Sequence, residues 1–152
     1  MDKVIFLDVD GVLNVMSDSY RTFMKPYGQH IEPHLVERLN YLIKKTDAYV
    51  VVSSSWRVHM DDLEKQMVEQ GFKYWDKVIG ATAYDGKYRG EQIADWISAN
   101  KFEGIYCVLE DEPSDICGNK CRAIGARYVV HIDMNEGLSQ NDIDRALGIL
   151  GV

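Results

Sequence analysis

The 152-residue sequence predicts a doubly wound α/β fold, a three-layer sandwich with helices on both faces of a central, mainly parallel sheet. Short apolar runs rich in β-branched residues alternate along the chain with segments whose apolar residues recur at helical spacing. Acidic or hydroxyl side chains directly follow three of these runs, and ligands bind at the carboxyl ends of strands in such folds. The length suits one domain spanning residues 1–152.

The first apolar run, residues 4–7, predicts a buried central strand because no polar residue interrupts it. Asp8 and Asp10 follow it, and a turn at Gly11 is expected to bring both carboxylates to one site. Burying two unpaired anions at a strand end is costly unless a cation is present. The pair therefore predicts a Mg²⁺ site.

The other elements follow in order along the chain. A helix is expected from Glu32, where Pro33 suits a first helical turn and apolar residues recur at helical spacing. Further elements are predicted as a strand at 48–52, a helix at 58–70, a strand or extended segment at 77–83, a helix at 91–100, a strand at 104–109, a strand at 126–132 and a helix capped by Ser139.

The Asp-Val-Asp-Gly sequence after an apolar strand resembles the first motif of the haloacid dehalogenase (HAD) superfamily of phosphohydrolases. This resemblance implies a HAD-like Rossmannoid fold with Asp8 as nucleophile and Asp10 as general acid and base. In the second motif a hydroxyl residue follows a strand and holds the transferring phosphoryl group. Ser53 matches that position after residues 48–52, and Ser54 matches it if the strand is one residue longer.

The third motif is a basic residue near the start of the helix that precedes the last catalytic strand. Arg89 fits it, with Lys87 as the competing candidate. The fourth motif is acidic and follows the strand at 104–109. Asp111 fits both of its known spacings, either next to Glu110 or four residues before Asp115, so the resemblance implies Asp111 as a Mg²⁺ ligand, supported by one of the other two.

The run Ser-Ser-Ser-Trp-Arg at 53–57 narrows the resemblance to the small capless phosphatase modules of RNA-repair proteins. Arg57 would then clamp the substrate phosphate, because a guanidinium can bind two oxygens at once. Residues 16–29, where the superfamily inserts a cap, leave room only for a loop or small flap. The resemblance thus implies an open site for a phosphorylated oligonucleotide terminus, with a 3′-phosphate as the expected substrate and no stable protein partner.

Two other functions remain open. A phosphatase of small molecules, such as nucleotides or sugar phosphates, would differ only in substrate. A non-catalytic phosphorylation-receiver or phosphate-binding module would share the strand-end acid, but it needs the phosphoryl group to persist, which Asp10 opposes. A zinc site at Cys117, Cys121 and His131 is disfavoured because a fourth ligand at matching spacing is missing.

Composition limits the partners further. The net charge of −7 argues against broad coating of nucleic acid, although it permits a local basic pocket. No apolar stretch approaches a membrane span and no signal peptide precedes the first strand, so we expect a cytoplasmic protein. An odd number of cysteines, three, predicts free thiols.

Overall fold

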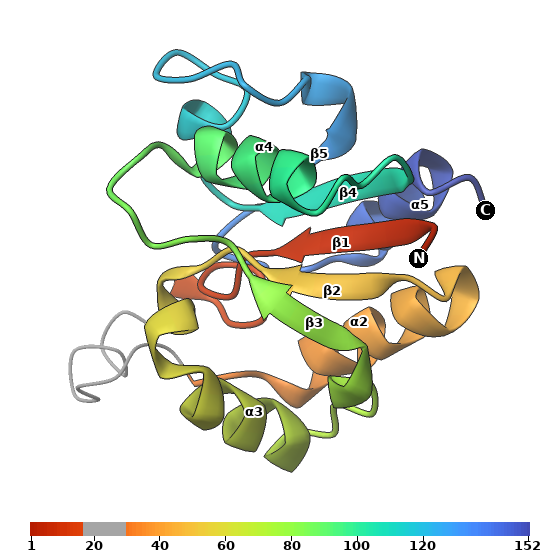
Figure 1. The fold of residues 1–152 in the computed structure, drawn as a ribbon. Helices are drawn as coiled ribbons and strands as arrows, with labels where there is room; N and C mark the ends of the chain where they lie inside the picture. The colour runs from red at the N-terminus through yellow and green to blue at the C-terminus, as the bar shows by residue number, and fades with distance from the viewer. Residues whose placement is uncertain (17–29) are drawn as a thin grey trace.

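A computed structural model of the chain describes residues 1–16 and 30–152. Within these residues five strands form one parallel sheet in the order β3-β2-β1-β4-β5 (Figure 1). The predicted fold class is confirmed, and the sheet is parallel at every pairing described. The strands are β1 (Lys3–Leu7), β2 (Tyr49–Val52), β3 (Val78–Ala81), β4 (Ile105–Glu110) and β5 (Val129–His131).

Strand β1 lies at the centre of the sheet, with β2 on one side and β4 on the other. Its side chains alternate between the two faces, since Ile5 and Leu7 pack in one core cluster whereas Val4 and Phe6 pack in the other. All four are fully buried, which explains why the sequence here is apolar without a break.

Helices cover both faces of the sheet (Figure 1). The larger core contains buried residues of α2 (Pro33–Thr46), α3 (Met60–Glu69) and α5 (Gln140–Ile149). The opposite core is smaller and contains Ile93 of α4 (Arg89–Ala99). Together these layers form the expected three-layer sandwich. None of the helices within the two described ranges is both long and apolar enough to cross a membrane.

Two predicted elements differ from the structure. The helix expected at 58–70 begins with a separate 3₁₀ turn, η2 (Ser55–His59), before α3. The strand expected at 126–132 is another 3₁₀ turn, η5 (Ala126–Tyr128), followed by the three-residue strand β5. β5 lies at the edge of the sheet, where β4 is its only partner among the described strands, and edge strands are often short. The flap predicted at 16–29 falls on residues 17–29, outside the described residues.

The carboxyl ends of the central strands are held together beyond their last paired residues. The Asp8 amide donates to the Leu109 carbonyl at 3.0 Å, and the Ser53 amide donates to the Leu7 carbonyl at 2.8 Å. The Thr82 amide donates in the same way to the Val52 carbonyl at 3.0 Å. These bonds fix the first residue after each of three strands, so the polar side chains at this edge start from rigid backbone.

Candidate functional site

Three carboxylates meet at the carboxyl edge of the sheet. Asp8 follows β1, while Glu110 ends β4 and Asp111 follows it; one oxygen of each lies within 4.8 Å of the others. The parallel register that pairs Leu7 with Leu109 makes this meeting unavoidable, because Asp8 and Glu110 then occupy equivalent positions on neighbouring strands. We call these three residues the acid group.

The acid group is poor in positive charge. Burial, followed by the charge of Asp8, raises the pKa of Glu110 well above its usual range. Burial, then a hydrogen bond and charge repulsion from Asp8, raises the pKa of Asp111 to about 7. Without a bound cation, Glu110 and Asp111 therefore tend to keep their protons. Oxygen ligands at this spacing and charge suit a hard divalent cation, so these residues fit a metal site.

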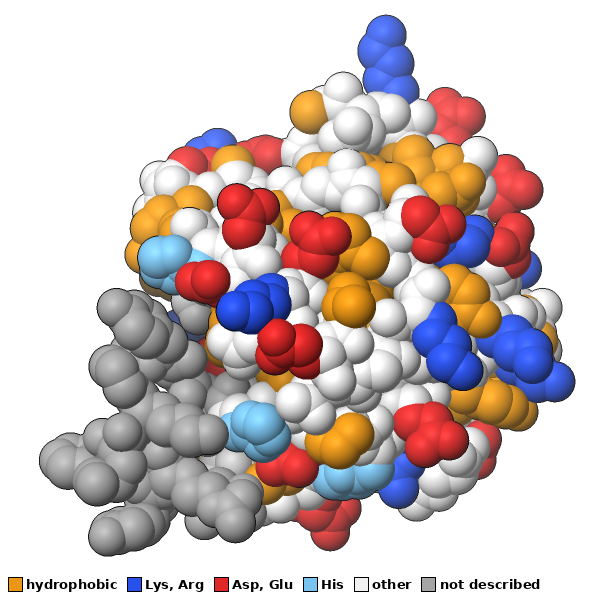
Figure 2. All heavy atoms as spheres, turned by 90° about the horizontal axis from the view of Figure 1, so that it is seen from below, with side chains coloured by type: hydrophobic (Ala, Val, Ile, Leu, Met, Phe, Trp, Pro, Cys, Tyr) orange, Lys and Arg blue, Asp and Glu red, His pale blue; other side chains and the backbone are white. Residues whose placement is uncertain are grey.

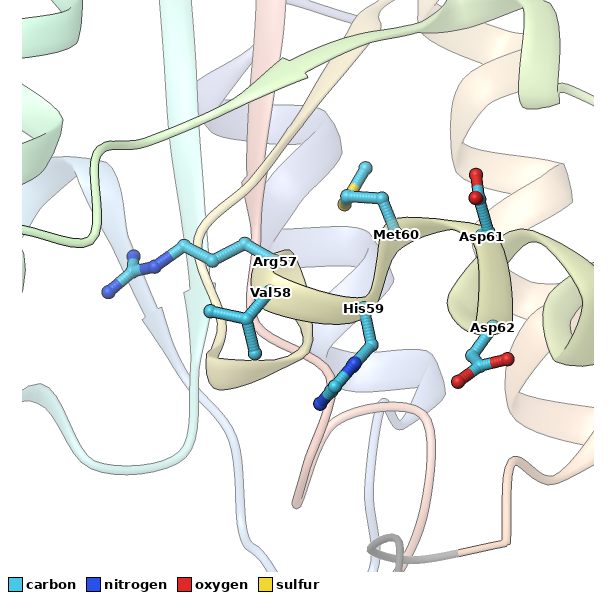
Figure 3. Close-up of a pocket in the computed structure, with 6 residues that line it drawn as sticks. All are labelled: Arg57, Val58, His59, Met60, Asp61 and Asp62. Carbon is cyan, nitrogen blue, oxygen red and sulfur yellow. The ribbon is translucent and has the colours of Figure 1, made fainter.

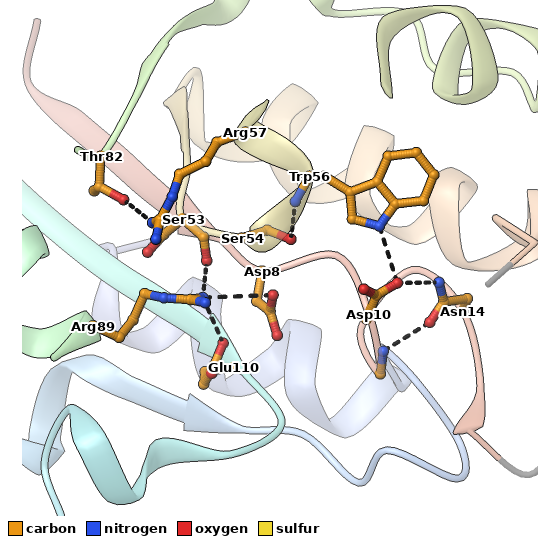
Figure 4. Close-up of polar contacts among 11 residues, drawn as sticks. Asp8, Asp10, Asn14, Ser53, Ser54, Trp56, Arg57, Thr82, Arg89 and Glu110 are labelled. Atoms are coloured by element: carbon orange, nitrogen blue, oxygen red, sulfur yellow. Dashed lines mark hydrogen bonds and ion pairs between the residues drawn. The ribbon is translucent and has the colours of Figure 1, made fainter. Parts of the chain in front are cut away.

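One cation already reaches the acid group. Nη1 of Arg89, at the start of α4, lies 3.6 Å from Asp8 and 3.8 Å from Glu110 (Figure 4). It also donates to the Ser53 carbonyl. Arg89 thus ties together the ends of β1, β2 and β4 and leaves Asp111 without a share of its charge in these ion pairs.

The two candidate serines have different environments. The Ser54 hydroxyl accepts from the Trp56 amide at 3.2 Å, which caps η2. The Ser53 hydroxyl oxygen is buried and has no hydrogen-bond partner among the described residues. A buried hydroxyl without a partner is costly unless a ligand uses it. Ser53 is therefore the better placed of the two to bind a ligand.

The Asp10 carboxylate is fixed by two donors on one oxygen. Oδ1 accepts from Trp56 Nε1 at 3.0 Å and from Asn14 Nδ2 at 2.9 Å (Figure 4). Asn14 in turn accepts from the Gly11 amide at 2.8 Å, which closes the turn after β1. Trp56 is buried, and its indole N–H orients Asp10.

Gly11 brings this turn against the acid group. Its φ of +79° is in the left-handed region, and a Cβ there would lie 2.4 Å from Asp111 Oδ2. A side chain at position 11 would therefore strain the backbone and displace a carboxylate oxygen. The glycine of the Asp-x-Asp-Gly sequence is needed for both reasons.

Arg57 lies on the other side of the site. Its Nη1 donates to Thr82 Oγ1 at 2.7 Å, and its Nε is buried without a partner among the residues that the structure describes. Burial, and next the charge of Arg89, lowers the pKa of Arg57. A guanidinium held in this way has an unmet donor and gains from a bound anion.

A hollow of about 440 Å³ lies beside Arg57, lined by η2 and the start of α3 (Figure 3). Asp61 and Asp62 line its far end, so only the Arg57 end favours an anion. A second hollow of about 350 Å³ lies beside Asp111 and is lined by residues 131–135. His131 there forms a hydrogen bond of 3.1 Å with the Asp111 carbonyl.

Two of the alternative candidates from the sequence, Lys87 and Asp115, do not contribute to the acid group or to its ion pairs. Lys87 Nζ pairs with Asp95 at 2.9 Å, and both side chains are about half exposed. Asp115 ends the short 3₁₀ turn η4 (Pro113–Asp115) and is not one of the three clustered acids. The geometry thus separates Arg89 from Lys87, and Glu110 from Asp115.

Sequence reasoning did not single out Asn14 or Thr82. Thr82 is a buried hydroxyl residue directly after β3, the same signal that selects Ser53 after β2. Asn14 lies four residues after Asp10 across a glycine turn, a spacing typical of a side chain that closes a loop onto its own start.

Comparison with known families gives one finding. A family model described as "HAD domain in Swiss Army Knife RNA repair proteins" matches residues 4–143. Neither the search of curated proteins nor the search of solved structures gave a match. The matched segment includes every residue of the site described above.

Proposed function

Because the chain belongs to the family of HAD domains found in Swiss Army Knife RNA repair proteins, we propose that it is a metal-dependent phosphomonoesterase with Asp8 as nucleophile. The observation that carries this proposal is the position of Asp8 within the acid group and beside Arg89. Asp10, two residues further along the chain, has a carboxylate that is oriented by hydrogen bonds. A receiver or binding module has no need of the second, fixed carboxylate.

The first step is attack of an Asp8 oxygen on phosphorus. The new Asp8 O–P bond forms as the ester P–O bond breaks, which splits one difficult displacement into two easier ones. Arg89 lies 3.6 Å from Asp8 and opposes the repulsion between this carboxylate and the incoming phosphate. The unpartnered Ser53 hydroxyl and Arg57 Nε supply donors for phosphoryl oxygens.

Asp10 moves the protons. Its hydrogen bonds from Trp56 and Asn14 both reach Oδ1 and fix the plane of the carboxyl group. We assign Oδ2 to proton transfer: it protonates the leaving ester oxygen, then takes a proton from the water that attacks the aspartyl phosphate. The products are an alcohol, inorganic phosphate and free Asp8.

The metal is proposed to be Mg²⁺, held by Asp8, Asp111 and the Asp10 carbonyl, with Glu110 in support. Mg²⁺ prefers oxygen ligands and keeps several waters, which suits an acid group open to solvent on the Asp111 side. When bound, the ion would neutralise charge on the phosphoryl oxygens. Glu110, buried beside Arg89, also keeps that guanidinium in position.

The proposed substrate is a polynucleotide with a terminal 3′-phosphate. The support is the family description together with two arginines that can grip a single terminal phosphate. Nucleotides and sugar phosphates are the competing substrates. They share the chemistry and differ only in what surrounds the leaving oxygen.

The test is phosphate release with Mg²⁺ from 3′-phosphorylated oligonucleotides, mononucleotides and sugar phosphates, compared as kcat/KM. We expect the oligonucleotide to be preferred and Asp8→Asn to lower its turnover by more than about a thousandfold. The variant should keep or raise the thermal unfolding temperature, because it removes one of three crowded carboxylates. Wild-type turnover by Asp8→Asn, or a stoichiometric and stable aspartyl phosphate in the wild type, would contradict the proposal.

A further inference from the structure

Tyr84 is the most exposed large hydrophobic side chain among the described residues, at 73%. It follows β3 by three residues and so lies in the loop that leads from the carboxyl edge of the sheet to α4. The Arg57 guanidinium lies over its ring, 5.1 Å from the ring centre. An exposed aromatic ring thus stands next to a side chain that we assign to the substrate phosphate.

From this juxtaposition we propose that Tyr84 is a stacking platform for the nucleobase next to the phosphate that is removed. The inference rests on the proposed function and specifies its leaving group as a nucleotide. An aromatic side chain stacks on any base, because every base has a π-face, so the preference is for a base and not for a sequence.

The contacts around Tyr84 order the platform before substrate binds. Arg57 is anchored to Thr82 at 2.7 Å, which fixes the cation under the ring. The residue after Tyr84, Asp85, accepts from the Lys87 amide and from Gln92 Nε2, both at 3.1 Å. A loop held in this way loses little conformational entropy when a base stacks on it.

The Arg57 donors explain why the base would lie here. Arg57 Nε is buried without a described partner, and the ring lies against the same guanidinium. A phosphate that reaches Nε therefore brings its own nucleoside within reach of the ring. A sugar phosphate has no π-face to gain from this contact, so Tyr84 would separate the two substrate classes.

The experiment compares two 3′-phosphorylated oligonucleotides, one with a normal terminal nucleotide and one with an abasic terminal nucleotide. In Tyr84→Leu, kcat/KM should fall about tenfold on the first, mainly through KM, and stay unchanged on the second. Tyr84→Phe should retain the wild-type preference, since it keeps the ring. Tyr41→Leu is the matched control, because Tyr41 is also exposed and lies under a cation, Lys45, but on α2.

Three results would overturn the inference. Tyr84→Leu could lower kcat/KM equally on both oligonucleotides, which would mean that the ring only positions Arg57. The variant could leave kcat/KM unchanged on both, or the wild type could hydrolyse both oligonucleotides with equal kcat/KM. In the last two cases the phosphatase activity stands although the platform fails.

A second readout does not depend on turnover. The Asp8→Asn protein is titrated into an oligonucleotide with 2-aminopurine, a fluorescent base that is quenched on stacking, beside the 3′-phosphate. Quenching that Tyr84→Leu removes and Tyr84→Phe keeps supports the platform even if no substrate is hydrolysed. If the Asp8→Asn protein with Tyr84 intact binds the oligonucleotide without quenching its fluorescence, the platform is overturned.

Discussion

At the scale of single residues, the site is dominated by an imbalance of charge. Of the three clustered carboxylates, only Asp8 and Glu110 pair with the Arg89 guanidinium within the described residues, and burial and the charge of Asp8 raise the pKa of both Glu110 and Asp111. A group that keeps its proton in the folded state and loses it in the unfolded state makes stability depend on pH. The direction of that dependence follows from the shifts.

We therefore predict that the metal-free protein loses stability as pH rises from about 4 to about 7. Unfolded Asp111 ionises near its ordinary value of 3.8, whereas folded Asp111 holds its proton until about 7, so the stabilisation is complete below pH 4 and lost above 7. The measurement is the unfolding temperature in chelator across this range. Saturating Mg²⁺ should restore the stability most at the upper end, because the ion replaces the protons.

Asp111→Asn is the matched variant for this prediction. It removes the titrating proton but keeps the volume of the side chain, so the pH dependence should flatten and the Mg²⁺ concentration for half-maximal activity should rise sharply. A pH profile in chelator that is as steep as in the wild type would show that Asp111 is not the group responsible.

A second residue-scale prediction concerns the orientation of Asp10. Trp56→Phe removes the Nε1 donor 3.0 Å from Asp10 Oδ1 and keeps an aromatic ring in the core. We expect kcat to fall roughly tenfold with little change in KM, because general acid–base catalysis depends on a correctly placed carboxyl. Trp96→Phe is the control, since Trp96 lies on α4 and packs against Phe6 in the core on the opposite face of the sheet. An equal loss of kcat in both variants would indicate a packing effect only.

At the scale of elements, the turn after β1 joins conformation to chemistry. Gly11→Ala places a side chain in the left-handed region, which costs about 1–2 kcal/mol, and drives a Cβ against Asp111. Gly71→Ala makes a similar backbone demand at φ +98° with open space around it. We predict that both variants lower the free energy of unfolding, but that only Gly11→Ala raises the Mg²⁺ requirement. Equal metal requirements, measured by activity titration and by unfolding temperature with Mg²⁺, would contradict this.

The elements also show how far the sequence alone could lead. The buried strands β1, β2 and β4 are recognisable because they are covered on both faces and because acidic or hydroxyl residues follow directly after them. The edge strand β5 is also recognised, but its predicted start is too early, because residues 126–128 form the 3₁₀ turn η5. The choice of Arg89 over Lys87 depends on where a loop turns, since Lys87 instead reaches Asp95, nearly two turns into α4. The spacing of residues in the sequence does not indicate which of the two side chains points toward the acid group.

At the scale of the whole molecule, charge limits how nucleic acid can bind. The net charge is −7, and on the face seen in Figure 2 the described acidic and basic side chains are interspersed without a continuous basic stripe. A surface of this kind does not track a phosphate backbone over many nucleotides. We therefore expect a terminal phosphate to be attracted mainly by Arg57 and Arg89 at the carboxyl edge of the sheet.

The resulting prediction is a shallow salt dependence. For single strands, the slope of log affinity against log salt is about −0.7 for each phosphate neutralised, so the one terminal phosphate bound at the site should give a slope of about −0.7 in log kcat/KM on a 3′-phosphorylated oligonucleotide below saturation. Arg57→Ala should bring the slope closer to zero, because it removes a cation that we assign to this phosphate. Lys87→Ala should not, because Lys87 is paired with Asp95.

The same reasoning predicts a weak dependence on length, with kcat/KM nearly constant beyond a few nucleotides. The measurement is a series of 3′-phosphorylated oligonucleotides of increasing length at several salt concentrations, with the wild type and both variants. If kcat/KM rises steadily with length and the salt slope steepens with it, the chain grips a long stretch of backbone through cations outside this edge. If instead both stay flat and only Arg57→Ala changes the slope, recognition is confined to the terminal nucleotide, where Arg57 and Tyr84 lie against each other.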